Sequence, residues 1–169
     1  VLCTPLKGWE TGTMVGVAIK PAGGQKGPQG QTKGIIQGKA ARGGMVLGDP
    51  ATATTVWMTE AAVDVASLYE LNHQKNPKAA YVAMAGARIP GPDFIDAFFA
   101  NFPNAKEFVG AFNNDYVGRR ASQDLANEAT KRGKLRTNSV DSLTGINASD
   151  NLGPGTPTMH FDQWETEDE

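Results

Sequence analysis

The chain has 169 residues, of which 40% are hydrophobic and 20% charged, with a formal net charge of -2. This length suits one domain with a sizeable core, and no apolar run approaches the roughly 18–20 residues of a membrane span, so we expect a soluble protein without membrane association. A basic-then-apolar leader is absent, and the single Cys3 makes no internal disulfide, which together favour a cytoplasmic location. Because the first residue is Val1, we expect a piece of a longer chain whose flanking domains are missing.

The charge is distributed unevenly along the chain. Residues 1–48 hold six Lys or Arg against one acid, and twelve of the 20 glycines, whereas residues 134–169 hold two bases against seven acids. We therefore divide the chain into a Gly-rich basic lead-in with short strands (1–48), an α/β core (49–133) and an acidic, loosely structured tail (134–169). Within the lead-in, the polar Gly-rich stretch 21–34 is expected to be a loop.

Strands and helices alternate along most of the chain. Three short apolar runs bounded by glycine predict strands in the lead-in, at 14–18, 34–36 and 45–47. Further on, β-prone runs predict strands at 55–59, 80–85 and 108–112. Helical spacing of apolar residues predicts helices at 61–73, 92–102 and 115–131. The alternation with short connections predicts an α/β fold in which helices flank a central, mainly parallel sheet.

Polar residues stand where these strands end. Right-handed crossovers would place Glu60, Gly86 and the pair Asn113 and Asp115 along one edge of the sheet, where α/β folds bind ligands. Asp64 follows Glu60 by one helical turn and would share its face. Oxygen ligands two residues apart at a strand end suit a hard cation such as Mg²⁺. The sequence therefore predicts an acidic, cation-binding edge.

These residues form an ordered set of motifs. EAAVDVAS starts at Glu60, Gly86 closes the next strand, and FNNDYVGRRA starts at Phe112. The set resembles the Toprim domain shared by bacterial-type primases, topoisomerases and related nucleases, with its patterns E-G-x-x-D-A-L-S and F-D-x-D-x-x-G-R-x-A. The resemblance covers about residues 34–133 and is greatest to Toprim-like modules of mobile-element primases and plasmid mobilisation proteins, where a Gly-rich lead-in such as KAARGGMVLG precedes the Glu strand.

The resemblance implies a Rossmann-like Toprim fold and Mg²⁺-dependent (or Mn²⁺-dependent) phosphoryl transfer on nucleic acid, with DNA favoured over RNA as the partner. It implies Glu60 as general acid or base. The implied metal ligands are Asp115, Asn113 and Asp64. Basic residues suited to the nucleic-acid backbone are Lys39, Arg42, Arg119 and Arg120. Glycines that would let the backbone approach a bound group are Gly86 and Gly118. The module would belong to a primase-like nucleotidyltransferase or nuclease, or to a mobilisation protein.

Two departures from the family pattern leave a second interpretation open. Asn113 stands where the family has the first Asp of its pair, and a neutral amide contributes no charge to a metal site. The downstream acidic element of primase-like members, K-D-x-N-D, has only Asp141 and the pair at 150–151 as candidates. The alternative is a catalytically degenerate Toprim fold that serves as a DNA-binding or protein-docking module.

Simpler roles also remain for the same residues. Glu60 could favour a helix start through the helix dipole, and Asp115 could act only as a helix N-cap. Asp64 could pair with a neighbouring base, and Arg119 and Arg120 could be solvated surface charges.

Overall fold

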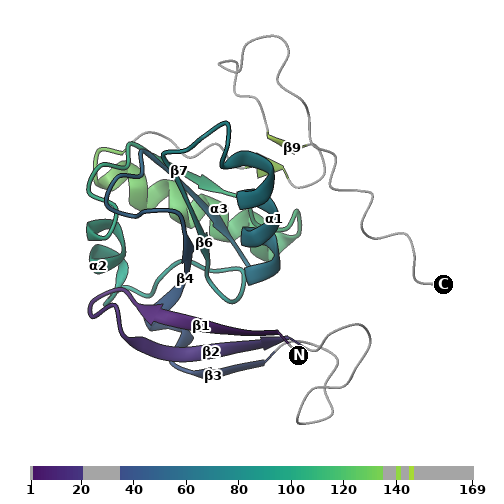
Figure 1. The fold of residues 1–169 in the computed structure, drawn as a ribbon. Coiled ribbons are helices and arrows are strands. Elements are labelled where there is room, and N and C mark those ends of the chain that lie inside the picture. Colours follow the sequence, from purple (N-terminus) through teal and green to yellow (C-terminus); the bar gives the residue numbers. More distant parts are fainter. Residues whose placement is uncertain (1, 21–34, 135–139, 142–144, 147–169) are drawn as a thin grey trace, which may run out of the picture.

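A mixed sheet of seven strands, in the order β3-β2-β1-β4-β6-β5-β7, runs through the protein (Figure 1). The computed structural model describes residues 2–20, 35–134, 140–141 and 145–146. The loop expected at 21–34 and most of the expected acidic tail lie outside the described residues. In the tail, β8 (Val140–Asp141) and β9 (Gly145–Ile146) pair as a separate two-stranded sheet.

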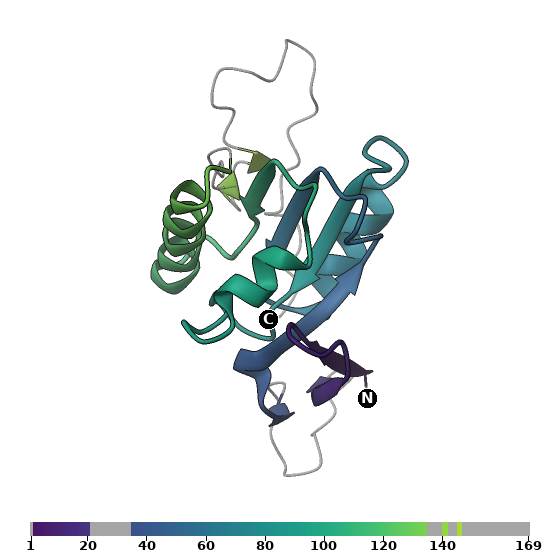
Figure 2. The same ribbon diagram turned by 90° about the vertical axis from the view of Figure 1, so that its left-hand side faces the viewer.

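The parallel part of the sheet carries the alternating strands and helices. Its strands are β5 (Thr55–Thr59), β6 (Ala79–Ala83) and β7 (Glu107–Gly110), with β5 between the other two. The helices that follow them in turn are α1 (Ala62–Asn72), α2 (Ile95–Ala100) and α3 (Tyr116–Lys131). α1 covers one face of the sheet, and α2 and α3 cover the other (Figures 1 and 2). The expected α/β, Rossmann-like arrangement is confirmed.

Antiparallel strands extend this core at one side. β1 (Leu2–Gly8), β2 (Met14–Lys20) and β3 (Ile35–Gly38) form a meander. The short helix η1 (Ala40–Arg42) then leads into β4 (Gly43–Leu47), which pairs antiparallel with β6. β1 pairs with β4 only at Lys7 and Gly8, so the backbone pairing joins the meander to the core at one end, and the meander lies below the parallel strands (Figure 1). The parallel character is therefore confined to β5, β6 and β7.

Two apolar clusters hold the two faces of the sheet. Between the sheet and α2 and α3, the fully buried side chains include Phe98, Phe102 and Phe108. Between the sheet and α1, the buried residues include Val65 and Tyr81. Burying one such side chain contributes roughly 1.5–3 kcal/mol, so the ends of the parallel strands are firmly positioned. In the described part of the chain, no helix is long and apolar enough to cross a membrane.

Three local features differ from the sequence expectations. β1 was not predicted; it contains Pro5, which lacks an N–H, and it tolerates this because β1 pairs with β4 only further along. α2 begins at Ile95, three residues later than expected, after a loop with two prolines. Val117 is 54% exposed, because the buried face of α3 instead includes Gly118 and Ser122.

Candidate metal and nucleic-acid site

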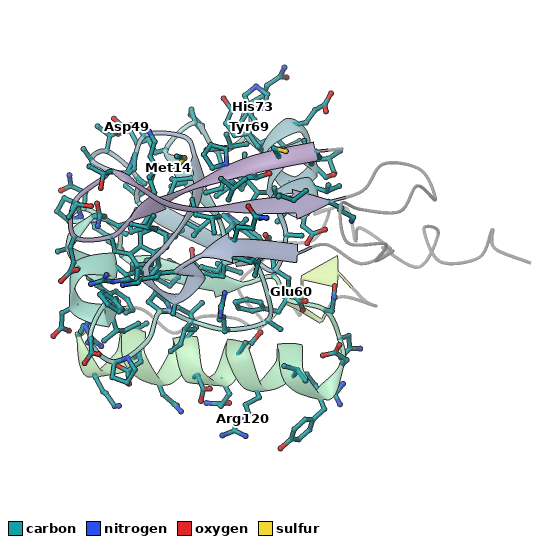
Figure 3. The ribbon with its side chains drawn as sticks, turned by 90° about the horizontal axis from the view of Figure 1, so that it is seen from below. Met14, Asp49, Glu60, Tyr69, His73 and Arg120 are labelled. Atoms are coloured by element: carbon teal, nitrogen blue, oxygen red, sulfur yellow. The ribbon has the colours of Figure 1, made fainter. Side chains whose placement is uncertain are left out.

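The carboxyl ends of the three parallel strands bring the predicted residues together. Glu60 follows β5, Gly86 follows β6 and Asn113 follows β7. The backbone N–H of Asn113 donates to Oε1 of Glu60 at 3.0 Å, and the N–H of Gly86 donates to the carbonyl of Glu60 at 2.8 Å. Figure 3 shows Glu60 at this edge, between the antiparallel strands and α3. Glu60 therefore links all three strand ends.

The turn after β6 has an unusual backbone. Ala85 adopts φ of +54°, the one positive φ at a non-glycine position among the described residues, and Gly86 follows with φ of +135°. A β-carbon at Gly86 would meet nothing within 4 Å, so this glycine leaves open space beside Glu60. The strain at Ala85 is compatible with a functional turn, where such conformations concentrate.

The start of α3 is shaped by Asp115 and Gly118. Asp115 is the N-cap of α3, and its Oδ1 accepts from the N–H of Gly118 at 2.7 Å. A β-carbon at Gly118 would lie 2.0 Å from the carbonyl oxygen of Asn113. Gly118 is thus required for the loop at 113–115 to fold back onto α3. The group that approaches Gly118 closely is the backbone carbonyl of Asn113.

Asp64 sits at the start of α1 and is held there by a local contact. Its Oδ2 accepts from the N–H of Ala61 at 3.0 Å, which satisfies one of the unpaired N–H groups at the helix start. Burial of the carboxyl group raises the pKa of Asp64, opposed by that hydrogen bond and by the charge of Lys20. Helix capping accounts for its position, and a role toward a metal stays a prediction.

The electrostatics of Glu60 reflect a concentration of acids. Burial raises the pKa of the Glu60 carboxyl, the hydrogen bond from Asn113 opposes this rise, and the negative charges of Asp115 and Asp64 add to it. A cation placed at this edge would relieve the repulsion between these carboxylates. The site is therefore electrostatically suited to a positive ligand.

The donor atoms fit Mg²⁺ in kind. Glu60 and Asp115 each offer a carboxylate and Asn113 offers an amide oxygen, and Mg²⁺ is commonly held by one or two carboxylates together with waters and substrate phosphates. Across the described ranges, no three His, Cys, Asp or Glu side chains are grouped closely enough to hold a metal ion by themselves. A metal here would therefore depend on Asn113, on water or on a phosphate of the substrate.

The four predicted basic residues lie in different settings, and none of them lines the groove beside Glu60. Arg119 is turned back on its own loop, where its Nη1 donates to the carbonyl and Oδ1 of Asn114 at 2.9 and 3.0 Å. Arg120 is exposed and extends away from α3 (Figure 3). Lys39 is exposed beside η1, and the guanidinium of Arg42 lies over the Phe94 ring, 4.9 Å from its centroid.

A groove next to Glu60 was not anticipated from the sequence. It has a volume of about 280 Å³ and separates the core-facing side of the meander from the start of α1. Residues that line it include Leu2, Thr4, Ala18, Lys20, Ile36 and Glu60. Buried and exposed residues alternate along β1, but no local signal in the sequence indicates that the buried side faces Glu60.

The fold and the site define an α/β domain with Glu60 and Asp115 at the carboxyl edge of its parallel strands. Residues 57–150, more than half of the chain, match the profile of the Toprim-like family, and the chain belongs to this family. Family membership suggests a nucleic-acid-processing module, and Toprim domains generally bind Mg²⁺. The resemblance identified from Glu60, Gly86 and the motif at Phe112 is confirmed at the level of the family.

The other comparisons add little about function. A putative fumarate hydratase class I from Geobacillus stearothermophilus is 68% identical over 38 residues, which are 22% of this chain and 7% of that protein. A match this short is smaller than a domain, so it carries no argument about activity. No solved structure matches the chain.

Proposed function

We propose that the chain is the metal-dependent Toprim module of a nucleic-acid-processing protein, of the primase-like or mobilisation type, that carries out phosphoryl transfer on DNA. The proposal depends most on one observation: the Glu60 carboxylate is held against the backbone of Asn113 at 3.0 Å, beside Asp115, where three parallel strands end. Catalytic groups must be positioned before they can act, and this contact fixes Glu60 relative to the Asn113–Asp115 segment.

The proposed roles follow from the state of each side chain. The raised pKa of Glu60 brings its carboxyl closer to neutral pH, which suits a group that accepts and returns a proton. Asp115 and Asn113 would hold the metal, since Asp115 uses only Oδ1 for the helix cap. When bound, the ion would stabilise negative charge on a phosphoryl group in transfer. Arg120 and Lys39, both exposed, would contact backbone phosphates.

A metal titration tests the proposal. Mg²⁺ and Mn²⁺ would be titrated into the intact chain while amide NMR signals of Asn113, Gly86 and Gly118 are followed, with calorimetry as a second readout. Asn113→Asp should tighten Mg²⁺ binding by about tenfold, equivalent to about 1.4 kcal/mol, because it adds a charged ligand. Asn127→Asp is the matched control, since it adds the same charge at an exposed position further along α3.

A second variant, Glu60→Gln, separates a catalytic role of Glu60 from a role in metal binding alone. Glu60→Gln should retain much of the metal affinity and lose activity on DNA, because it keeps an oxygen for Asn113 and loses the proton-transfer group. If millimolar Mg²⁺ or Mn²⁺ shifts none of these signals in the wild type or in Asn113→Asp, the metal-dependent proposal is wrong.

A second candidate function is favoured by Asn113 itself. Without the first acid of the pair, the module would serve as a catalytically inactive DNA-binding or docking domain. It predicts DNA binding that weakens with salt and is unaffected by Glu60→Gln or by removal of divalent ions. Measurable Mg²⁺-dependent turnover that Glu60→Gln abolishes would exclude this candidate.

A further inference from the structure

A second groove lies on the other side of the Gly86 turn from Glu60. It has a volume of about 480 Å³ and lies between the loop that joins β6 to α2 and one side of α3. Residues that line it include Arg88, Ile89, Pro92, Val117, Arg120 and Asp124. Pro90 and Pro92 restrict the backbone of this loop close to α2, so this part of the wall is preformed. Of these lining residues the proposed function uses only Arg120, and it assigns no role to Arg88.

Arg88 is the unusual residue of this groove. It is half-buried, and its Nη2 donates to the carbonyl of Ala85 at 3.3 Å. Its Nε is buried and has no hydrogen-bond partner in the part of the chain that the structure describes, and no described carboxylate forms an ion pair with it. A guanidinium has five N–H donors, and leaving a partly buried charge uncompensated is unfavourable. Arg88 is therefore poised to take an anion.

The turn that holds Arg88 also holds Glu60. The N–H of Gly86 donates to the carbonyl of Glu60, and the carbonyl of Gly86 accepts from the N–H of Arg88 at 2.9 Å. Ala85 and Gly86 line the groove beside Glu60, and the following residues line the second groove. A chain that crosses the Gly86 turn would thus pass from Glu60 directly to Arg88.

The remaining charges of the groove leave a net attraction for anions near Arg88. Arg120 stands at the rim on α3 and points away from the helix (Figure 3). Glu128 also lines the groove, but Lys131 and Arg132 neutralise it with contacts at 2.5 and 2.6 Å. Asp124 opposes an anion, since it lines the groove without an ion-pair partner among the described residues.

We propose that this groove binds a backbone phosphate of the nucleic acid next to the nucleotide that reaches Glu60, with the guanidinium of Arg88 as the main contact and Arg120 at the rim. The inference rests on the proposed function, because it presupposes that the chain binds nucleic acid. The planar guanidinium matches two phosphate oxygens, and such contacts fix the register of the strand without reading its sequence. Ile89 and Val117 provide apolar surface that suits the sugar.

The test measures binding of a fluorescent single-stranded DNA oligonucleotide to the intact chain over a series of salt concentrations. Arg88→Gln should weaken binding several-fold and reduce the slope of log affinity against log salt by about 0.7, the value for one phosphate contact on a single strand. The affinity of Arg88→Lys should lie between those of the wild type and Arg88→Gln, since lysine keeps the charge and loses the planar geometry. Asp124→Asn should strengthen binding, because it removes the opposing charge.

Two controls keep this inference separate from the proposed function. Lys75→Gln removes a positive charge on an exposed loop at the opposite end of the parallel strands and should leave the salt slope unchanged. The Nε–H signal of Arg88, followed by NMR while inorganic phosphate is added, should shift in the wild type and in Glu60→Gln alike.

Each result bears on one of the two claims. If DNA binds and Arg88→Gln keeps the wild-type affinity and slope, the phosphate groove is wrong while nucleic-acid binding stands. If phosphate shifts the Arg88 signal but DNA does not bind, the groove takes an anion and the proposed function fails. If neither DNA nor phosphate affects Arg88, the inference is overturned.

Discussion

Replacing Gly118 by alanine sets two physical effects against each other. Gly118 is the third residue of α3, and alanine in a helix interior is favoured over glycine by about 1 kcal/mol. However, the new β-carbon would lie 2.0 Å from the carbonyl oxygen of Asn113 and 2.9 Å from its carbonyl carbon. Contacts below 3.0 Å are essentially never seen, and both opposing atoms are backbone, so the loop must retreat by about 1 Å.

We expect the clash to exceed the gain in helix propensity. Overpacking costs about 1–3 kcal/mol, and loss of the Asp115 cap adds about 1 kcal/mol. Against the gain of about 1 kcal/mol, the free energy of unfolding should fall by about 1–3 kcal/mol. The same displacement would draw the Asn113 N–H away from Glu60, so the variant should also lose metal response at this site.

Urea unfolding followed by circular dichroism measures the change in stability, and the Asn113 amide signal reports on the loop. Asn127→Ala, at an exposed position of the same helix, is the control for helix propensity and should stay within about 0.5 kcal/mol of wild type. A Gly118→Ala variant as stable as wild type, with an unchanged Asn113 signal, would refute the assignment of Gly118 to this backbone contact.

Two further predictions concern single side chains. Because the pKa of Glu60 is raised, the folded state binds that proton more tightly than the unfolded state, so stability should fall as pH rises through the raised pKa. The free energy of unfolding of the wild type and of Glu60→Gln would be measured by urea unfolding at successive pH values. The difference between the two profiles should isolate this fall, and identical profiles would contradict the raised pKa. Tyr81 is fully buried, and its hydroxyl has no partner among the described residues, so Tyr81→Phe should leave the free energy of unfolding unchanged or raise it by up to about 1 kcal/mol. Thermal unfolding measures this, and a loss above about 1 kcal/mol would show that the hydroxyl has a partner.

The sequence by itself determined the alternating core and the residues at its strand ends. Apolar runs and helical spacing identify β5, α1, β6, α2, β7 and α3 within a few residues, because these are local patterns. The handedness of strand crossovers then places Glu60, Gly86 and Asn113 at one edge, since that rule depends only on the order of elements. The Toprim-like family could be recognised from these positions for the same reason.

Only the tertiary structure decided what these residues contact. That Asn113 donates to Glu60 and that its carbonyl packs against Gly118 depends on backbone paths that no local pattern records. β1 was difficult to predict because a proline such as Pro5 argues against a strand. Proline is tolerated where the neighbouring strand edge is unpaired, and only the structure shows that β4 does not pair with β1 at Pro5. The sequence did not identify Arg88 as a binding residue. An arginine stands out as a candidate only when the folded chain buries it without a hydrogen-bond acceptor. Local chemistry thus identified the acidic edge, and long-range packing determined the two grooves on either side of it.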